Sequence, residues 1–244
     1  MKRRAALLPN NKSVAKTLGL IGGTGPESTI DYYRLLVAKF REQADGNSPP
    51  VIINSVNLKY MIEWMTAGEL QKVADYLSTE IEKLHQAGAD LAALTANTPH
   101  IVFDELQQRS AVPLISIVEA ACDNVQALGL NSVGLFGTRF TMQAPFYPAV
   151  FSRAGIRLVL PNDEEQNYIH EIYMGELLKD VFLPETRTRL LALADAMRAR
   201  DGIEAVILGG TELPLLLRDE EHNGMPLLDT TRIHVERLIA EMLS

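Results

Sequence analysis

"AVILGGTELPLL", residues 205–216, is the stretch that decides the fold. Four apolar residues lead into two glycines and then into Thr211 and Glu212, which is typical of a buried strand that ends at a polar loop. In α/β proteins, the carboxyl ends of parallel strands hold the ligand. Gly210 has no side chain that could react, so any chemistry at this loop must come from its neighbours.

The same pattern occurs earlier in the chain. Residues 87–98, "AGADLAALTANT", align with residues 201–212, "DGIEAVILGGTE", so that Ala96 matches Gly210 at a spacing of 114. Three further pairs keep this spacing to within one residue: Gly88 with Gly202, Gly19 with Gly134, and Pro113 with Pro226. A repeat of this length indicates a duplicated α/β unit, because solenoid repeats span only about 20–50 residues.

Strands that alternate with helices predict an α/β fold with parallel sheets. We expect two pseudo-symmetric lobes, each a parallel sheet flanked by helices, with the site in the cleft between them. The first lobe is expected to comprise residues 17–116 and 227–244, and the second residues 117–226. Residues 1–16 are expected to be a flexible extension.

Composition excludes several classes of protein. The net charge is −8 and no stripe of Lys and Arg occurs, which argues against a nucleic-acid partner or an anionic membrane surface. No apolar run is long enough to span a bilayer, and the run Ala5–Leu8 is too short for a signal peptide. The single cysteine, Cys122, excludes an internal disulfide. We therefore expect a cytoplasmic protein with a small-molecule ligand.

Small polar residues recur at the predicted strand ends. Together with backbone N–H groups at helix starts, such side chains suit a carboxylate ligand. The candidate binding residues are Thr24, Asn97, Thr98, Thr138 and Thr211, with Lys59 and Lys179 as candidate cations for a second carboxylate or, alternatively, as solvated surface lysines.

From about residue 17 to 244 the chain resembles the cofactor-independent aspartate/glutamate racemases and their hydantoin racemase relatives. The resemblance is carried by five segments: "LIGGTGPEST" (20–29), "TANTPH" (95–100), "FGTRFTM" (136–142), "PNDEEQNYIHEIY" (161–173) and "ILGGTELP" (207–214). It implies two similar α/β lobes with the site between them, no cofactor, and an acidic amino acid as substrate. A homodimer is a possible oligomeric state, with a monomer left open. It also implies two-base proton transfer at Cα, normally by two cysteines on opposite faces of the substrate.

The chain departs from this pattern at both catalytic positions. Ala96 and Gly210 stand where the resemblance places the two cysteines, and neither can carry a proton. Cys122 lies in a predicted helix and is expected to be a small buried hydrophobe. Glu212 and His100 match family positions beside the thiols and are the candidate substitutes, provided that burial tunes their pKa values.

Two functions therefore stay open. The first is an amino-acid racemase with weak or absent activity, working through substitute bases such as Glu212 and His100. The second is a binding protein that keeps the pocket for a dicarboxylate or acidic amino acid without turnover. No metal site is expected, because the histidines show no ligand spacing.

Overall fold

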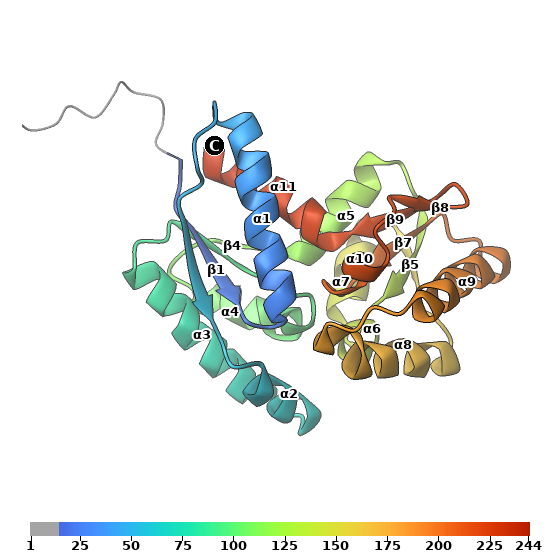
Figure 1. Ribbon diagram of the computed structural model, residues 1–244. Coiled ribbons are helices and arrows are strands. Elements are labelled where there is room, and N and C mark those ends of the chain that lie inside the picture. The colour runs from blue at the N-terminus through green and yellow to red at the C-terminus, as the bar shows by residue number, and fades with distance from the viewer. Residues whose placement is uncertain (1–14) are drawn as a thin grey trace, which may run out of the picture.

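The computed structural model describes residues 15–244, which form two sheets with helices between and around them (Figure 1). The first sheet is parallel with the order β2-β1-β3-β4, formed by β1 (Leu18–Gly22), β2 (Val51–Ser55), β3 (Leu91–Leu94) and β4 (Leu114–Ile115). The second has the order β6-β5-β7-β9-β8, formed by β5 (Ser132–Phe136), β6 (Arg157–Val159), β7 (Ala205–Leu208), β8 (Glu221–His222) and β9 (Met225–Asp229). Only β8, at its edge, runs antiparallel, so the predicted α/β class with two similar sheets is confirmed.

Helices connect almost every pair of parallel strands. In the first half these are α1 (Pro26–Gln43), α2 (Leu58–Thr66), α3 (Leu70–Gln86), the 3-10 helix η1 (Thr98–Val102) and α4 (Phe103–Arg109). The second half contains α6 (Arg139–Gln143), α7 (Phe146–Arg153), α8 (Asp163–Gly175), η2 (Leu177–Lys179), α9 (Pro184–Asp201) and α10 (Leu213–Leu216). Helix α5 (Ile117–Ala127) connects the two sheets, and α11 (Thr230–Leu243) follows the last strand. No helix within residues 15–244 is both long and apolar enough to cross a membrane.

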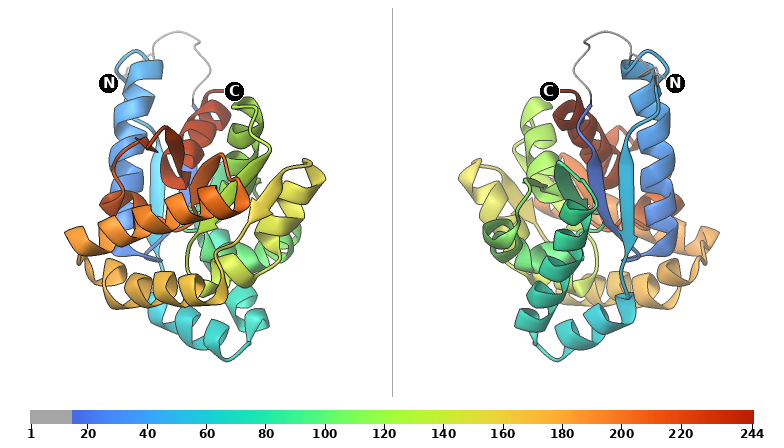
Figure 2. Two further views of the ribbon diagram at one scale, coloured as in Figure 1. Left: turned by 90° about the vertical axis from the view of Figure 1, so that its right-hand side faces the viewer. Right: turned by 90° about the vertical axis from the view of Figure 1, so that its left-hand side faces the viewer.

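Side chains of each central strand alternate between a core that both sheets share and a second core on the other face of their own sheet. On β1, Leu18 and Leu20 face a core shared with α1, α5, α7 and α11, whereas Ile21 faces the core under α3. On β7, Ala205 and Ile207 face the same shared core, and Val206 faces the core under α8 and α9. The shared core lies between the sheets, with α5 and α11 in the middle of the molecule (Figures 1 and 2). It joins the two halves, because burying apolar surface from both sheets in one cluster favours their association.

The register of the strands reproduces the repeat found in the sequence. In the first sheet Gly19 pairs with Ala92, which pairs with Leu114. In the second sheet Gly134 pairs with Val206, which pairs with Leu227. Corresponding strands of the two halves therefore end at corresponding loops.

The predicted division into lobes stays a proposal and needs one correction. Helix α11 packs against α1 of the predicted first lobe and also against α5 of the predicted second lobe. However, the predicted boundary after residue 226 falls inside β9, which stays in the second sheet as far as Asp229 because it hydrogen-bonds to β7. Of the predicted extension, residues 1–14 lie outside the described part, and Lys16 donates its backbone N–H to Met242 O at 2.9 Å.

Candidate functional site

The carboxyl ends of strands from both sheets meet at one small cavity of about 50 Å³. Its polar lining comes from the predicted loops of both halves: Thr24, Thr98, Thr138, Thr211 and Glu212. Ala96 lines the same cavity, as do Tyr173 and side chains of α2, α6 and η2. The structure therefore brings six of the predicted site residues to one place, at the position that the repeat implies.

The loop between β1 and α1 forms one side of the cavity. Gly25, which precedes α1, has a φ of 136°, a conformation that favours glycine. A Cβ on Gly25 would lie only 2.0 Å from Oε1 of Glu212, so the second half packs directly against this loop. Beside it, the Thr24 side chain is buried, and its Oγ1 has no hydrogen-bond partner among the described residues.

Ala96 follows β3 and presents a methyl group to the cavity. The preceding residue, Thr95, fixes this loop by donating its hydroxyl to Ile21 O on the neighbouring strand at 3.0 Å. The position is thus rigidly held, but it carries no group that can accept or donate a proton.

Three threonine hydroxyls join the start of η1 in the first half to the start of α6 in the second half. Thr98 Oγ1 lies 3.0 Å from Oγ1 of both Thr138 and Thr141. Thr138 also caps α6 by accepting the Thr141 N–H at 3.2 Å. Because these hydroxyls bond to one another, they hold the loops together across the cavity.

Asn97 belongs to a second, fully buried link between the halves. Its amide donates to Thr230 Oγ1 at 3.1 Å and accepts from the Tyr147 hydroxyl at 2.7 Å. Thr230 in turn donates to Leu208 O at the end of β7. Asn97 does not line the cavity, so the structure places this predicted binding residue behind the cavity wall.

Tyr173, at the end of α8, occupies the space next to Gly210. A Cβ at residue 210 would lie 2.4 Å from Cε2 and 2.7 Å from the hydroxyl of Tyr173. The phenol therefore stands where a side chain of residue 210 would point. Its hydroxyl donates a short hydrogen bond to Oε2 of Glu212, which also accepts from Thr211 Oγ1 at 3.2 Å.

Burial shapes the acidity of this pair. The Glu212 side chain is only 3% exposed, and burial raises the pKa of its carboxyl although the bonds from Tyr173 and Thr211 oppose the shift. Burial, followed by the charge of Glu212, raises the pKa of the Tyr173 phenol well above its usual range. Oε1 of Glu212 has no hydrogen-bond partner in the described part of the chain, so one acceptor at the cavity is left unsatisfied.

Comparison with known proteins agrees with this architecture. The family model for Asp/Glu/hydantoin racemases matches residues 21–238. The chain belongs to this racemase family. It is 24% identical to the "broad specificity amino-acid racemase RacX" of Bacillus subtilis over 234 residues, covering 93% of this chain and 98% of the relative.

Solved structures of racemase-family proteins have the same fold. A crystal structure of a candidate Asp/Glu racemase from Yersinia pestis is 31% identical, with a TM-score of 0.85 over 94% of this chain and 100% of that one. An aspartate racemase homologue from Pyrococcus horikoshii is 35% identical, with a TM-score of 0.79 over the same shares of the two chains. The two-lobe racemase fold expected from the sequence is thereby confirmed.

His100, expected as a substitute base, does not line the cavity beside Ala96. Its Nδ1 is 3.1 Å from Ala96 O, and its Nε2 accepts the Ile117 N–H at 3.3 Å. Burial lowers the pKa of this imidazole to about 4, so the ring is neutral and both nitrogens are engaged by the backbone. His100 is therefore not placed to transfer a proton at the cavity. Its two hydrogen bonds hold the Ala96 loop against the start of α5.

Both candidate lysines also lie outside the cavity. Lys59 has a side chain 77% exposed and sits 3.8 Å from Glu63 on the outer face of α2, and Lys179 is exposed at the end of η2. No Lys or Arg of residues 15–244 lines the cavity. Cys122 is buried in α5, beside a different cavity. The described residues form no cluster of His, Cys, Asp and Glu that could hold a metal ion.

Tyr173 is the functional candidate that sequence reasoning missed. It is the last residue of the motif at 161–173, but nothing in the sequence relates it to Gly210, 37 positions further on. The pairing is a tertiary contact, because Tyr173 of α8 packs against Gly210, which follows β7. The one signal in the sequence was Gly210 itself, because the family pattern has a cysteine side chain there and another residue could fill the space that its absence leaves.

Proposed function

We propose that this member of the racemase family binds a small amino acid in the cavity between its halves and does not racemise it by the two-thiol route. One observation carries the proposal. At the position of the first family cysteine, Ala96 offers only a methyl group, and at the position of the second, Gly210, the ring of Tyr173 fills the space that a side chain would occupy. Loss of one general acid or base typically reduces a rate by about 10²–10⁴-fold. With both thiols missing, we expect negligible interconversion of L and D forms.

Two unsatisfied buried oxygens support an amino acid as the ligand. Thr24 Oγ1 can donate to the α-carboxylate, which the N-terminal end of α1 also favours. Oε1 of Glu212 can accept from the α-ammonium group. Buried polar atoms in native proteins nearly always have partners, so a ligand that pairs both of them would be favoured. The relatives named as amino-acid racemases support the same ligand class.

A second candidate function is proton transfer at one face of the bound amino acid. The Tyr173–Glu212 pair favours it, because a carboxyl with a raised pKa is a stronger base than an ordinary glutamate. The Cα proton would pass to the phenol oxygen while the phenol proton passes to Glu212, and the reverse step would restore Cα–H. With no group at Ala96 to act from the other face, configuration would be retained.

The test is NMR of amino acids in D₂O with the full chain, combined with chiral chromatography. We expect neither exchange of the α-proton nor inversion. Exchange with retention would replace the binding-only proposal with the second candidate. Inversion would overturn both and return the chain to the racemases that use substitute bases.

Binding itself is tested by calorimetry with a panel of acidic and neutral amino acids and succinate. Thr24→Val should weaken the affinity for the best ligand about tenfold or more, because a hydrogen bond to a charged group is worth about 1.5–3 kcal/mol. Thr79→Val is the matched control, since Thr79 lies on α3 away from the cavity and its hydroxyl bonds to Asp75 O at 2.9 Å. Equal affinities for both variants would contradict the role given to Thr24.

The acidic or dicarboxylate ligand that we expect from the sequence is one side-chain class that this panel compares, and the homodimer and the cytoplasmic location stay predictions. The panel decides the ligand class, and sedimentation of the purified chain decides the oligomeric state.

A further inference from the structure

The part of the cavity that α2 lines is apolar. Helix α2 contributes Leu58, Met61, Ile62 and Met65, which share one face because they are spaced three and four residues apart. Met61 and Met65 are buried, whereas Leu58 and Ile62 are partly exposed.

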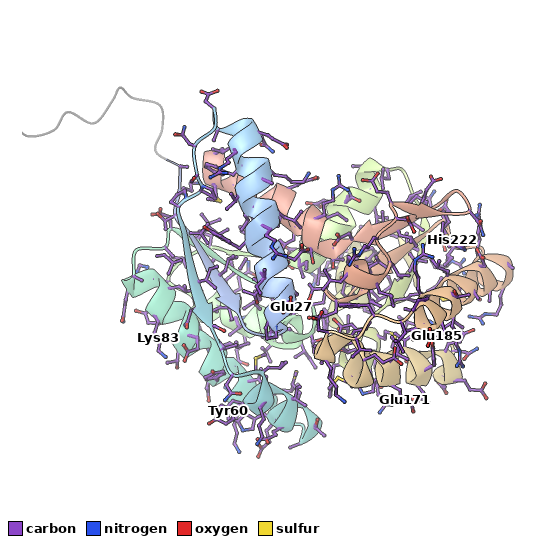
Figure 3. The ribbon with its side chains drawn as sticks, in the orientation of Figure 1. Glu27, Tyr60, Lys83, Glu171, Glu185 and His222 are labelled. Atoms are coloured by element: carbon purple, nitrogen blue, oxygen red, sulfur yellow. The ribbon has the colours of Figure 1, made fainter. Side chains whose placement is uncertain are left out.

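Side chains of the second half complete this apolar wall. They are Phe140 on α6, Met174 on α8 and Leu178 on η2. Helices α2 and α8 lie at the same end of the molecule in all views (Figures 1 and 2), and their labelled residues Tyr60 and Glu171 lie on its periphery (Figure 3). Most polar side chains of the cavity come from the loops at the strand ends, with Tyr173 of α8 as an exception, and most apolar ones come from the surrounding helices. A ligand that binds through its α-carboxylate and α-ammonium groups would thus place its side chain against the apolar wall.

This wall contains nothing that could neutralise a second carboxylate. Lys59 directly follows Leu58 on α2, but its side chain is 77% exposed, pairs with Glu63 and does not line the cavity, and no other described Lys or Arg lines it. Glu212 is itself acidic, so a second negative charge would meet repulsion as well as desolvation.

We infer that the ligand is an α-amino acid with an uncharged, apolar side chain, of which methionine and leucine are representative. The inference rests on the proposed function and adds the side-chain class to it. At about 50 Å³ the cavity is far smaller than the ~300 Å³ of common ligand pockets, so its walls must move apart on binding. Methionines are suited to this, because their unbranched side chains adapt to new shapes at low cost.

Calorimetry on the full chain tests the inference with L-methionine, L-leucine, L-glutamate and L-aspartate. L-methionine should bind at least about tenfold more tightly than L-glutamate, since an unpaired carboxylate is costly in an apolar wall. A smaller ratio, or tighter binding of L-glutamate, overturns the apolar side-chain class but leaves the proposed function intact. If no amino acid in the panel binds, the proposed function itself fails.

A charge introduced into the wall should reverse the preference. Ile62→Arg places a cation at a partly exposed position of the wall, so L-glutamate should gain at least about tenfold in affinity and L-methionine should lose affinity. Lys59→Gln is the control on the outer face of the same helix and should change neither affinity. Leu178→Arg repeats the test from the second half, where it does not depend on the packing of α2. An unchanged preference in a folded arginine variant overturns the inference.

Discussion

At the scale of single residues, Tyr173 decides whether thiols can be introduced at this site. A cysteine at 210 would collide with the tyrosine ring, because its Cβ would lie 2.4 Å from Cε2 of that ring. We expect Ala96→Cys with Gly210→Cys to be destabilised by about 1–3 kcal/mol and to stay inactive. Adding Tyr173→Ala should relieve the collision and allow interconversion of L and D forms, measured by chiral chromatography.

Tyr173→Phe on the same double-cysteine background is the matched control. It removes the hydroxyl but keeps the ring carbons that cause the collision, so it should rescue neither the melting temperature nor the activity. If the double-cysteine protein racemises as fast as the variant with Tyr173→Ala, the tyrosine does not block position 210.

At the scale of elements, two equivalent glycines let a helix approach each sheet. A Cβ at Gly19 would lie 3.0 Å from Ala89 Cβ and 3.1 Å from Leu84 Cβ, at the end of α3. At Gly134 it would meet Ile203 Cδ1 at 2.9 Å and Met197 Cε at 3.3 Å, beside α9. Because Cβ atoms move only with the backbone whereas side-chain ends can rotate, Gly19→Ala should destabilise more than Gly134→Ala, with losses of about 1–3 kcal/mol. Urea unfolding of the two variants measures the difference, and the opposite order would show that the contacts of Gly134 are the tighter ones.

At the scale of the whole molecule, two buried histidines tie stability to pH. Burial lowers the pKa of His100 to about 4 and that of His234 to about 3. In the unfolded chain both would take up a proton below about pH 6.5, whereas the folded protein keeps them neutral there. The free energy of unfolding should therefore fall as the pH drops from 6.5 towards 4, by up to about 1.4 kcal/mol per pH unit for each histidine.

His234→Gln isolates one of these contributions. In the wild type, His234 bonds to the Tyr32 hydroxyl at 2.9 Å and to Ile115 O at 3.0 Å, and it thereby joins α11 to α1 and β4. The variant should be less stable at pH 7.5, but its unfolding free energy should fall less steeply between pH 6.5 and 5. Equal slopes in chemical unfolding would contradict a neutral buried His234.

Much of the architecture could be predicted because it depends on local patterns. Apolar runs that end in glycine or threonine marked the strands, and the repeat aligned Ala96 with Gly210, whose loops now face one cavity. The sequence also indicated that Thr24 and Glu212 lie at strand ends, and both line that cavity. These features follow from strand direction and chain order, which the amino-acid pattern specifies directly.

The amino-acid sequence by itself determined the two-lobed fold and the absence of thiols at both positions, because periodicity and residue identity need no partner elsewhere in the chain. Only the tertiary structure decided what replaces those thiols and what the side chain of a ligand would meet. Tyr173 reaches Gly210 through the packing of α8, and Lys59 is exposed and paired with Glu63 outside the cavity. Which side chains meet at the cavity depends on how the helices rotate and pack against the sheets. Local sequence patterns do not specify that packing.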